Sequence, residues 1–165
     1  MDNGDVPAWL ALFISVCTAV HQWRVNANSE QVRKDTESKA NAQRESDQKR
    51  QRVEQILRDL EDLAALSLDY WMKPGSDSGA SGVLINSKVR DISSRISRYG
   101  MFLWPSAGQD FLLFKQAVTG GAFQSVTRAA ERPLSTTVRN ITSTSAQLKD
   151  KLRAELDRLD MPTRY

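Results

Sequence analysis

The feature that most constrains the fold is a long stretch, from Ala8 to Met72, that contains neither glycine nor proline. These two residue types interrupt helices most strongly, so their absence predicts a long helix rather than a series of short elements. Further along the chain, apolar residues recur at 3- and 4-residue intervals, which is typical of amphipathic helices, and no run alternates as a half-buried strand would. The sequence therefore predicts an all-α fold.

An uncharged and mostly apolar run, AWLALFISVCTAVHQW, occupies residues 8–23. A membrane-spanning helix needs about 20 apolar residues, with a lower limit near 17, so this run is slightly short. Trp9 and Trp23 bracket it, as aromatic residues do at membrane interfaces. We therefore expect a transmembrane helix over 8–23, and a buried helix of a soluble core is the alternative.

The charges on either side of this run predict its orientation. The preceding residues, 1–7, include Asp2 and Asp5 and no basic residue, whereas a secretory signal peptide begins with basic residues. Arg24, Arg33 and Lys34 follow the run, and basic residues mark the cytoplasmic side of a span. We expect a single-pass protein of the inner (cytoplasmic) membrane, with residues 1–7 outside and the C-terminus in the cytoplasm.

Small and polar residues within the run follow 3- and 4-residue steps, which places them on one helical face. They are Ala11, Ser15, Thr18, Ala19 and Gln22. Small residues at this spacing let helices approach closely, so one interpretation is a helix-packing face. The other interpretation is that the hydroxyl and amide groups line a narrow pore in an oligomer, because such groups are wettable.

Residues 24–52 form a strongly polar stretch with almost no apolar stripe. Opposite charges recur four residues apart, as in Arg33 and Glu37, and each such pair stabilises an isolated helix by about 0.2–0.5 kcal/mol. A helix that is polar on every side either connects two domains through solvent or is unstable. We expect a solvated helical stalk between the membrane and a folded domain, with a disordered linker as the alternative.

Residues 53–165 are expected to form a small cytoplasmic helical bundle, because several apolar stripes of helical spacing follow one another with short connections. The stripe of the second helix starts at Leu84/Ile85 and that of the last helix at Leu134. The boundaries follow from helix-breaking and capping residues: an end near Met72, an end at Pro105, a cap at Ser106, an end at Gly120-Gly121 and a start at Pro133. The core of so small a bundle is thin, so we expect a homo-oligomer.

Basic side chains on the second expected helix form a candidate binding site. The helix carries Lys88, Arg90, Arg95 and Arg98, whereas the charged side chains of residues 53–72 are mainly acidic. Together with Arg128 they are expected to bind an anionic ligand such as a nucleotide or an oligonucleotide, because Arg forks and small hydroxyls bind phosphates. The alternative is a solvated face with no specific partner.

The chain has one cysteine, Cys17, and one histidine, His21. Zinc sites, catalytic triads and Cys-His dyads need sets of partners that these two residues do not supply. No glycine-rich phosphate-binding motif occurs either. We therefore predict that the protein is not an enzyme and has no catalytic residue, no metal site and no cofactor.

The succession of a short apolar run (8–23), a charged helix free of Gly and Pro, and a small helical domain resembles the small membrane effectors of bacterial antiviral (anti-phage) defence systems. Among these it is similar to the oligomeric channel effectors of the Hailong type, which nucleotide or oligonucleotide signals hold shut or open. The resemblance extends over the whole length and includes no diagnostic motif, so it assigns no residue. It implies a homo-oligomeric ion channel whose cytoplasmic domain senses a ligand.

The expected function is therefore a gated pore or membrane-disrupting effector, formed by a homo-oligomer in contact with membrane lipid. Its cytoplasmic domain would sense an anionic ligand or a protein partner. Two alternatives belong to other classes of protein. One is a membrane-tethered helical scaffold or adaptor that docks a protein partner, and the other is a soluble helical oligomer.

Overall fold

The computed structural model describes the backbone of residues 6–160 and the side chains of residues 11–26 and 29–159. All of the regular elements in this part of the chain are helices, in the order α1, η1, α2, η2, α3 and α4, and it contains no strand. The prediction of an all-α fold is therefore confirmed. The chain divides into two compact units, residues 1–46 and 47–165, which are described separately below.

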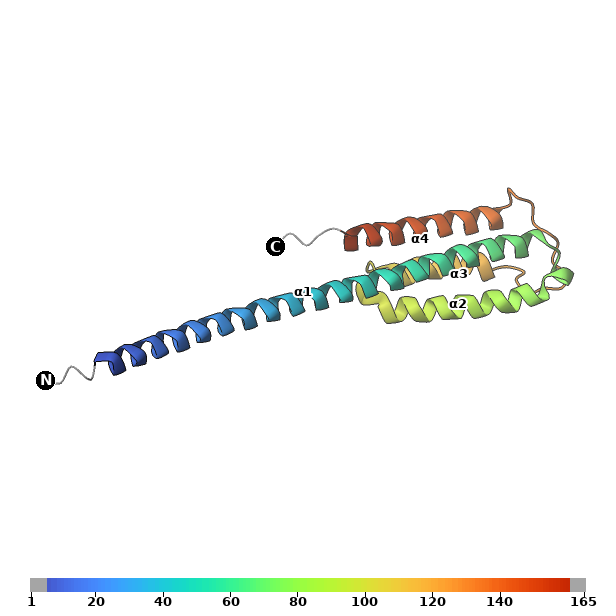
Figure 1. The fold of residues 1–165 in the computed structure, drawn as a ribbon. Coiled ribbons are helices and arrows are strands. Elements are labelled where there is room, and N and C mark those ends of the chain that lie inside the picture. The colour runs from blue at the N-terminus through green and yellow to red at the C-terminus, as the bar shows by residue number, and fades with distance from the viewer. Residues whose placement is uncertain (1–5, 161–165) are drawn as a thin grey trace. The chain divides into compact units, whose positions relative to one another are not determined.

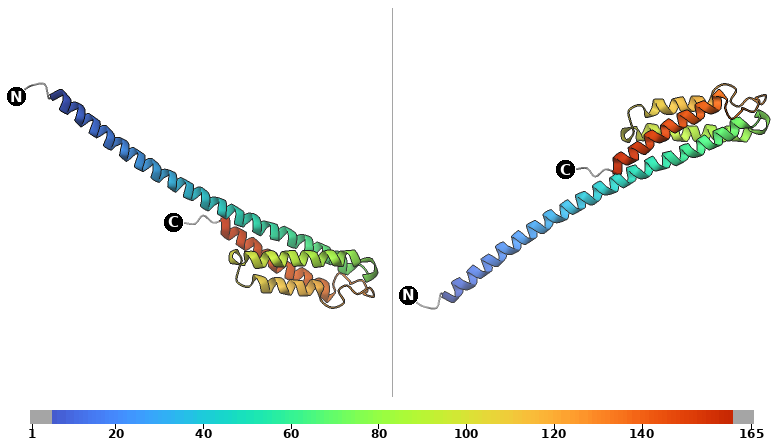
Figure 2. Two further views of the ribbon diagram at one scale, coloured as in Figure 1. Left: turned by 90° about the horizontal axis from the view of Figure 1, so that it is seen from below. Right: turned by 90° about the horizontal axis from the view of Figure 1, so that it is seen from above.

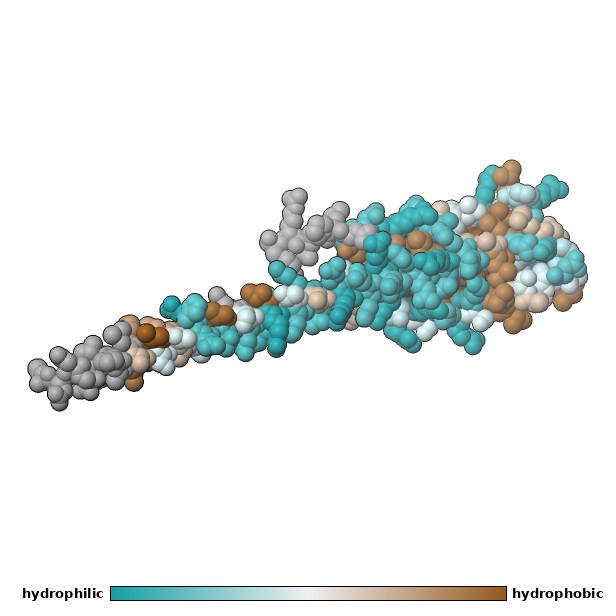
Figure 3. Space-filling model, in the orientation of Figure 1, coloured by the Kyte–Doolittle hydropathy of each residue, from teal (hydrophilic) through white to brown (hydrophobic). Residues whose placement is uncertain are grey.

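The first unit contains the N-terminal part of α1, which spans Val6–Met72. Nearly all of its described side chains are exposed. Hydrophobic residues lie on the surface towards the N-terminal end of this helix, and hydrophilic residues predominate further along it (Figure 3). The polar residues from Arg24 to Ser46 are helical, and the expected pair of Arg33 and Glu37 forms, with Nε and Oε1 3.4 Å apart.

The predicted transmembrane helix is not supported. Within the described residues, no helix has an apolar stretch long enough to cross a membrane. This finding contradicts the prediction of a single-pass inner-membrane protein. The flanking residues 1–5 and the side chain of Trp9, which also entered that prediction, lie outside what the structure describes.

The second unit is a helical bundle. The C-terminal part of α1 lies beside α2 (Gly79–Tyr99), α3 (Ala107–Thr119) and α4 (Thr136–Asp160) in all views (Figures 1 and 2). Short 3-10 helices, η1 (Gly75–Asp77) and η2 (Gly100–Phe102), adjoin the two ends of α2. A longer segment of residues 120–135, the α3–α4 connection, precedes the last helix.

The core of the bundle follows from apolar spacing. Along α1 the buried positions Val53, Ile56, Leu60 and Leu63 alternate steps of three and four residues, which keeps them on one side of a helix. Each of the other helices presents a stripe of the same kind to the shared core. These stripes include Ile85, Val89, Ile92 and Ile96 from α2, Phe111, Phe114 and Val118 from α3, and Ile141, Leu148 and Leu152 from α4.

Several details of the predicted bundle differ in the structure. The second helix ends at Tyr99 and not at Pro105. Ile85 is buried and Leu84 beside it is exposed, and Leu134 is exposed because it precedes α4. The last helix begins at Thr136 instead of Pro133, and the Ser135 hydroxyl accepts a hydrogen bond from the Val138 N–H at 3.3 Å. Ser106 does not cap the backbone of α3 with its side chain, since its hydroxyl donates to the Asp110 carboxylate at 3.1 Å.

Asp110 links α3 to α4 and to the segment that precedes α3. Its carboxylate also accepts hydrogen bonds from the Trp104 indole and from Lys151 of α4, the latter at 2.7 Å. Burial raises the pKa of this carboxyl, but the hydrogen bonds from Lys151, Trp104 and Ser106 and the charge of Lys151 outweigh burial and hold the pKa below its usual value.

Replacing Asp110 with asparagine should therefore reduce the free energy of unfolding at neutral pH by about 1–2 kcal/mol, because the charge-assisted bonds are lost. A carboxyl with a lowered pKa stabilises the fold above its unfolded-state pKa, and this contribution is lost as the pH falls through its folded-state pKa. Urea unfolding at neutral pH and at a pH of about 3 should show the difference between variant and wild type shrinking in acid.

Asp157, which is exposed, provides the matched control, and Asp157→Asn should leave stability unchanged at both pH values. An Asp110→Asn variant as stable as the wild type at neutral pH would contradict the stabilising role of this carboxylate.

Candidate functional site

A set of large apolar side chains is exposed on one face of α1 in the first unit. At about 100° per residue they fall within roughly 100° of arc. Their exposed fractions lie between 49% and 71%. This set, named the N-terminal apolar face below, consists of Leu12, Phe13, Val16, Val20 and Trp23. Exposed apolar side chains grouped in this way are typical of interaction surfaces.

The small and polar residues that the sequence singled out are all exposed: Ala11, Ser15, Thr18, Ala19 and Gln22. Ala19 borders the N-terminal apolar face beside Leu12, and the other four lie further around the helix. The Thr18 hydroxyl donates to the Ile14 carbonyl oxygen at 2.7 Å, so it is satisfied within its own helix. Ser15 and Gln22 lie roughly 110–130° around the helix from the centre of the N-terminal apolar face.

The predicted anion-binding residues are not brought together. Lys88 and Arg95 point towards α1, where Lys88 pairs with Asp62 at 3.5 Å and Arg95 pairs with Asp59 at 2.6 Å. These pairs join the basic helix α2 to the acidic part of α1. The opposite net charges of the two segments in the sequence indicate such pairing. Arg90 lies instead on the side of α2 that faces α3, and Arg98 is exposed.

The fifth predicted ligand-binding residue, Arg128, is buried at the end of α1, with 6% of its surface exposed. Its Nη1 donates to the Trp71 carbonyl at 3.1 Å, and its Nη2 donates to the Tyr70 carbonyl at 2.9 Å and the Ser78 hydroxyl at 2.8 Å. The last carbonyls of a helix have no partner within it and carry partial negative charge. Arg128 therefore acts as a cap on α1, supplied from the α3–α4 connection.

The cap is reinforced by aromatic and backbone contacts. The guanidinium lies over the rings of Tyr70 and Trp71, 4.4 and 4.8 Å from their centroids, in a cation–π arrangement. The Gly75 N–H donates to the Arg128 carbonyl at 2.9 Å. A side chain at Gly75 would collide with the backbone, since a Cβ there would lie 2.0 Å from the Ser125 carbonyl oxygen. Glycine is thus required where the connection crosses the end of α1.

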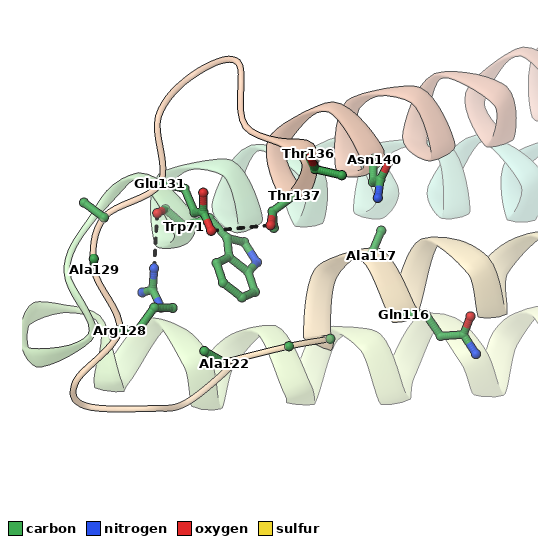
Figure 4. Close-up of a pocket in the computed structure, with 13 residues that line it drawn as sticks. Trp71, Gln116, Ala117, Ala122, Arg128, Ala129, Glu131, Thr136, Thr137 and Asn140 are labelled. Atoms are coloured by element: carbon green, nitrogen blue, oxygen red, sulfur yellow. Dashed lines mark hydrogen bonds between the residues drawn. The ribbon is translucent and has the colours of Figure 1, made fainter.

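A pocket of about 510 Å³ adjoins this cap, between the α3–α4 connection and the first turn of α4 (Figure 4). The Trp71 indole and the Glu131 carboxylate both lie at it, and Glu131 accepts a weak hydrogen bond from the Thr137 hydroxyl at 3.5 Å. Arg128 also lines the pocket, and the remaining lining is small or neutral: Gln116, Ala117, Gly120, Gly121, Ala122, Ala129, Ala130, Thr136 and Asn140. The amide and hydroxyl side chains among these can hydrogen-bond to a bound molecule.

Gly120 and Gly121 were predicted to end the third helix. α3 ends at Thr119, and Gly121 has a positive φ of 58°, a conformation that favours glycine. The Phe123 N–H donates to the Gly120 carbonyl at 3.3 Å. The two glycines therefore end the helix and turn the chain towards Arg128.

The described residues include no group of three or more His, Cys, Asp or Glu side chains arranged to hold a metal ion. Comparisons with models of protein families, with curated proteins and with solved structures find no match to this chain. The candidate surfaces are therefore identified by the structure of this chain alone.

Replacing Arg128 with methionine should lower the free energy of unfolding by about 3 kcal/mol, because the three hydrogen bonds of the buried guanidinium and its contacts with the Tyr70 and Trp71 rings are lost. Arg128→Lys should destabilise to a similar degree, since one ammonium group cannot reproduce the planar fork that reaches two carbonyls and Ser78. Equilibrium urea unfolding measures both effects.

Arg132, an exposed arginine on the same connection, provides the matched control. Arg132→Met should change stability by less than about 0.5 kcal/mol. If Arg128→Met were no more destabilising than this control, the capping role of Arg128 would be wrong.

Proposed function

We propose that this protein is a non-catalytic helical scaffold that self-associates through the N-terminal apolar face and carries a bundle that docks a protein partner. The observation that carries this proposal is the exposure of five large apolar side chains on one face of α1. A contiguous apolar surface of this kind is unfavourable in water and is stabilised when another protein covers it.

The partner proposed for this face is a second copy of the chain. Residues 11–23 carry no Lys, Arg, Asp or Glu, so two identical faces meet without charge repulsion. Phe13, Val16, Val20 and Trp23 are separated by three, four and three residues, the spacing that keeps a seam of side chains between paired helices. A two-fold interface places the same patch on both partners, and this patch is suited to pair with itself.

The free energies of side-chain burial and of association are consistent with pairing that needs the whole N-terminal apolar face. Full burial of a large apolar side chain contributes about 1.5–3 kcal/mol. Association costs roughly 4–15 kcal/mol in lost translational and rotational freedom. Five partly buried side chains from each copy can offset that cost, whereas a face that has lost two of them on each copy cannot.

Light scattering coupled to size-exclusion chromatography over a dilution series tests the proposal. The wild type should form a homo-oligomer, and the double variant Val16→Glu with Val20→Glu should be monomeric, because it places charges in the seam. The matched control is Ser15→Glu with Gln22→Glu, which adds the same charge outside the N-terminal apolar face and should leave the oligomer intact.

A monomeric wild type would overturn the proposal. So would an oligomer that resists the Val16 and Val20 substitutions but dissociates on substitution of Ser15 and Gln22, because the small and polar face would then be the packing surface. Circular dichroism of each variant establishes that the helices are retained.

A further inference from the structure

A second surface with the character of a binding site lies on the bundle, along the groove between α2 and α3. Two adjoining cavities of about 560 and 280 Å³ share Ser93 and Ser97 as lining residues, so they form one continuous depression. It extends along α2 from Asn86 to Gly100. At 1.5 Å per residue this length is roughly 20 Å, which matches three to four turns of a helix.

One half of this groove is positively charged. Arg90 of α2 and Lys115 of α3 line it, and both are exposed. In the described part of the chain no acidic side chain lines either cavity. On the opposite side of the same α2, by contrast, Lys88 and Arg95 are neutralised by acidic residues of α1. The groove therefore offers two cations for an acidic group from outside the bundle.

The other half of the groove carries no charged side chain. Its lining includes the buried residues Ile96 and Phe111 and three exposed small residues, Ser97, Gly100 and Gly108. Small residues at a helix surface allow another helix to approach its backbone closely. Leu112 is also exposed, and it follows Gly108 by four residues and precedes Lys115 by three, so it lies on the same side of α3 as the groove.

We propose that the groove between α2 and α3 docks an amphipathic helix of a partner protein, with acidic side chains against Arg90 and Lys115 and apolar side chains over Ser97, Gly108 and Leu112. Charge complementarity selects an acidic partner and sets its direction along the groove. The uncharged half lets the partner helix approach closely over its small residues, as in other complexes in which a helix lies in a groove.

This docking site specifies the partner in the proposed scaffold function but lies on the second unit, far along the sequence from the N-terminal apolar face. The two proposals therefore fail separately. Loss of self-association in the Val16 and Val20 variant leaves the groove unaltered, and substitutions in the groove leave the N-terminal apolar face unaltered.

Fluorescence anisotropy with the full chain and synthetic 16-residue peptides tests the site. The first probe is an amphipathic helix with three Glu at one end and an Ala/Leu face at the other. A second probe has the same composition in scrambled order, and a third replaces Glu with Lys. The wild type should bind the first probe at least about tenfold more tightly than the other two, since only this probe matches both halves of the groove.

Two groups of variants locate the binding. Arg90→Glu with Lys115→Glu should weaken binding of the acidic probe by about tenfold or more and should strengthen binding of the Lys-bearing probe. Ser97→Phe places a large side chain in the groove without altering its charge, and it should also weaken binding of the acidic probe. The matched control, Arg98→Glu with Arg139→Glu, makes the same change in charge at exposed positions outside the groove and should retain binding.

Equal affinity of the wild type for the ordered and scrambled acidic probes would overturn the proposal, because binding would then reflect charge alone. Equal losses in the groove variant and the control would do the same. A single-stranded oligonucleotide that bound more tightly than the acidic peptide, and lost affinity on substitution of Arg90 and Lys115, would identify the groove as a nucleic-acid site instead.

Discussion

The bundle depends on how the C-terminal end of α1 is capped. That end is buried, so the carbonyls of Tyr70 and Trp71 cannot be hydrated and need donors from the protein. Arg128 donates to both carbonyls and places a positive charge at the negative end of the helix. The N–H groups of Lys73 and Glu131 also donate, to the carbonyls of Tyr70 and Trp71 respectively. Because Arg128 belongs to the α3–α4 connection, the same contacts hold that connection across the end of α1. The pocket beside Trp71 and the start of α4 are positioned as a consequence.

The cap could not be predicted from the sequence, and other parts of the bundle could. Periodic apolar residues and the Lys73-Pro74-Gly75 break identify the end of α1 and most of the core, because these signals are local. Arg128 lies 57 residues after Trp71, and nothing local distinguishes it from an exposed arginine. For the same reason the groove was not predicted: Arg90 was grouped with Lys88 by composition, whereas its position on α2 separates it from Lys88 and brings it beside Lys115.

The N-terminal run shows how one pattern supports different hypotheses. A run of apolar residues between two tryptophans is compatible with a membrane span or with a protein interface, and length decides between them. No described helix is long and apolar enough to cross a membrane. Five of the large apolar side chains of the run lie on one face of α1, and Ile14 is exposed on the other side. Covering that face by a second copy accounts for both properties, because an interface between two helices needs a stripe and not a uniformly apolar surface.

Disulfide trapping tests this pairing most directly. In a Cys17→Ser background, single cysteines are placed in turn at positions 12–23, and the fraction of cross-linked dimer is measured under mild oxidation. Pairing through the N-terminal apolar face predicts maxima at Phe13, Val16, Val20 and Trp23, with minima at Ser15 and Gln22. The absence of cross-links at every position, or maxima at Ser15 and Gln22, would contradict self-association through this face.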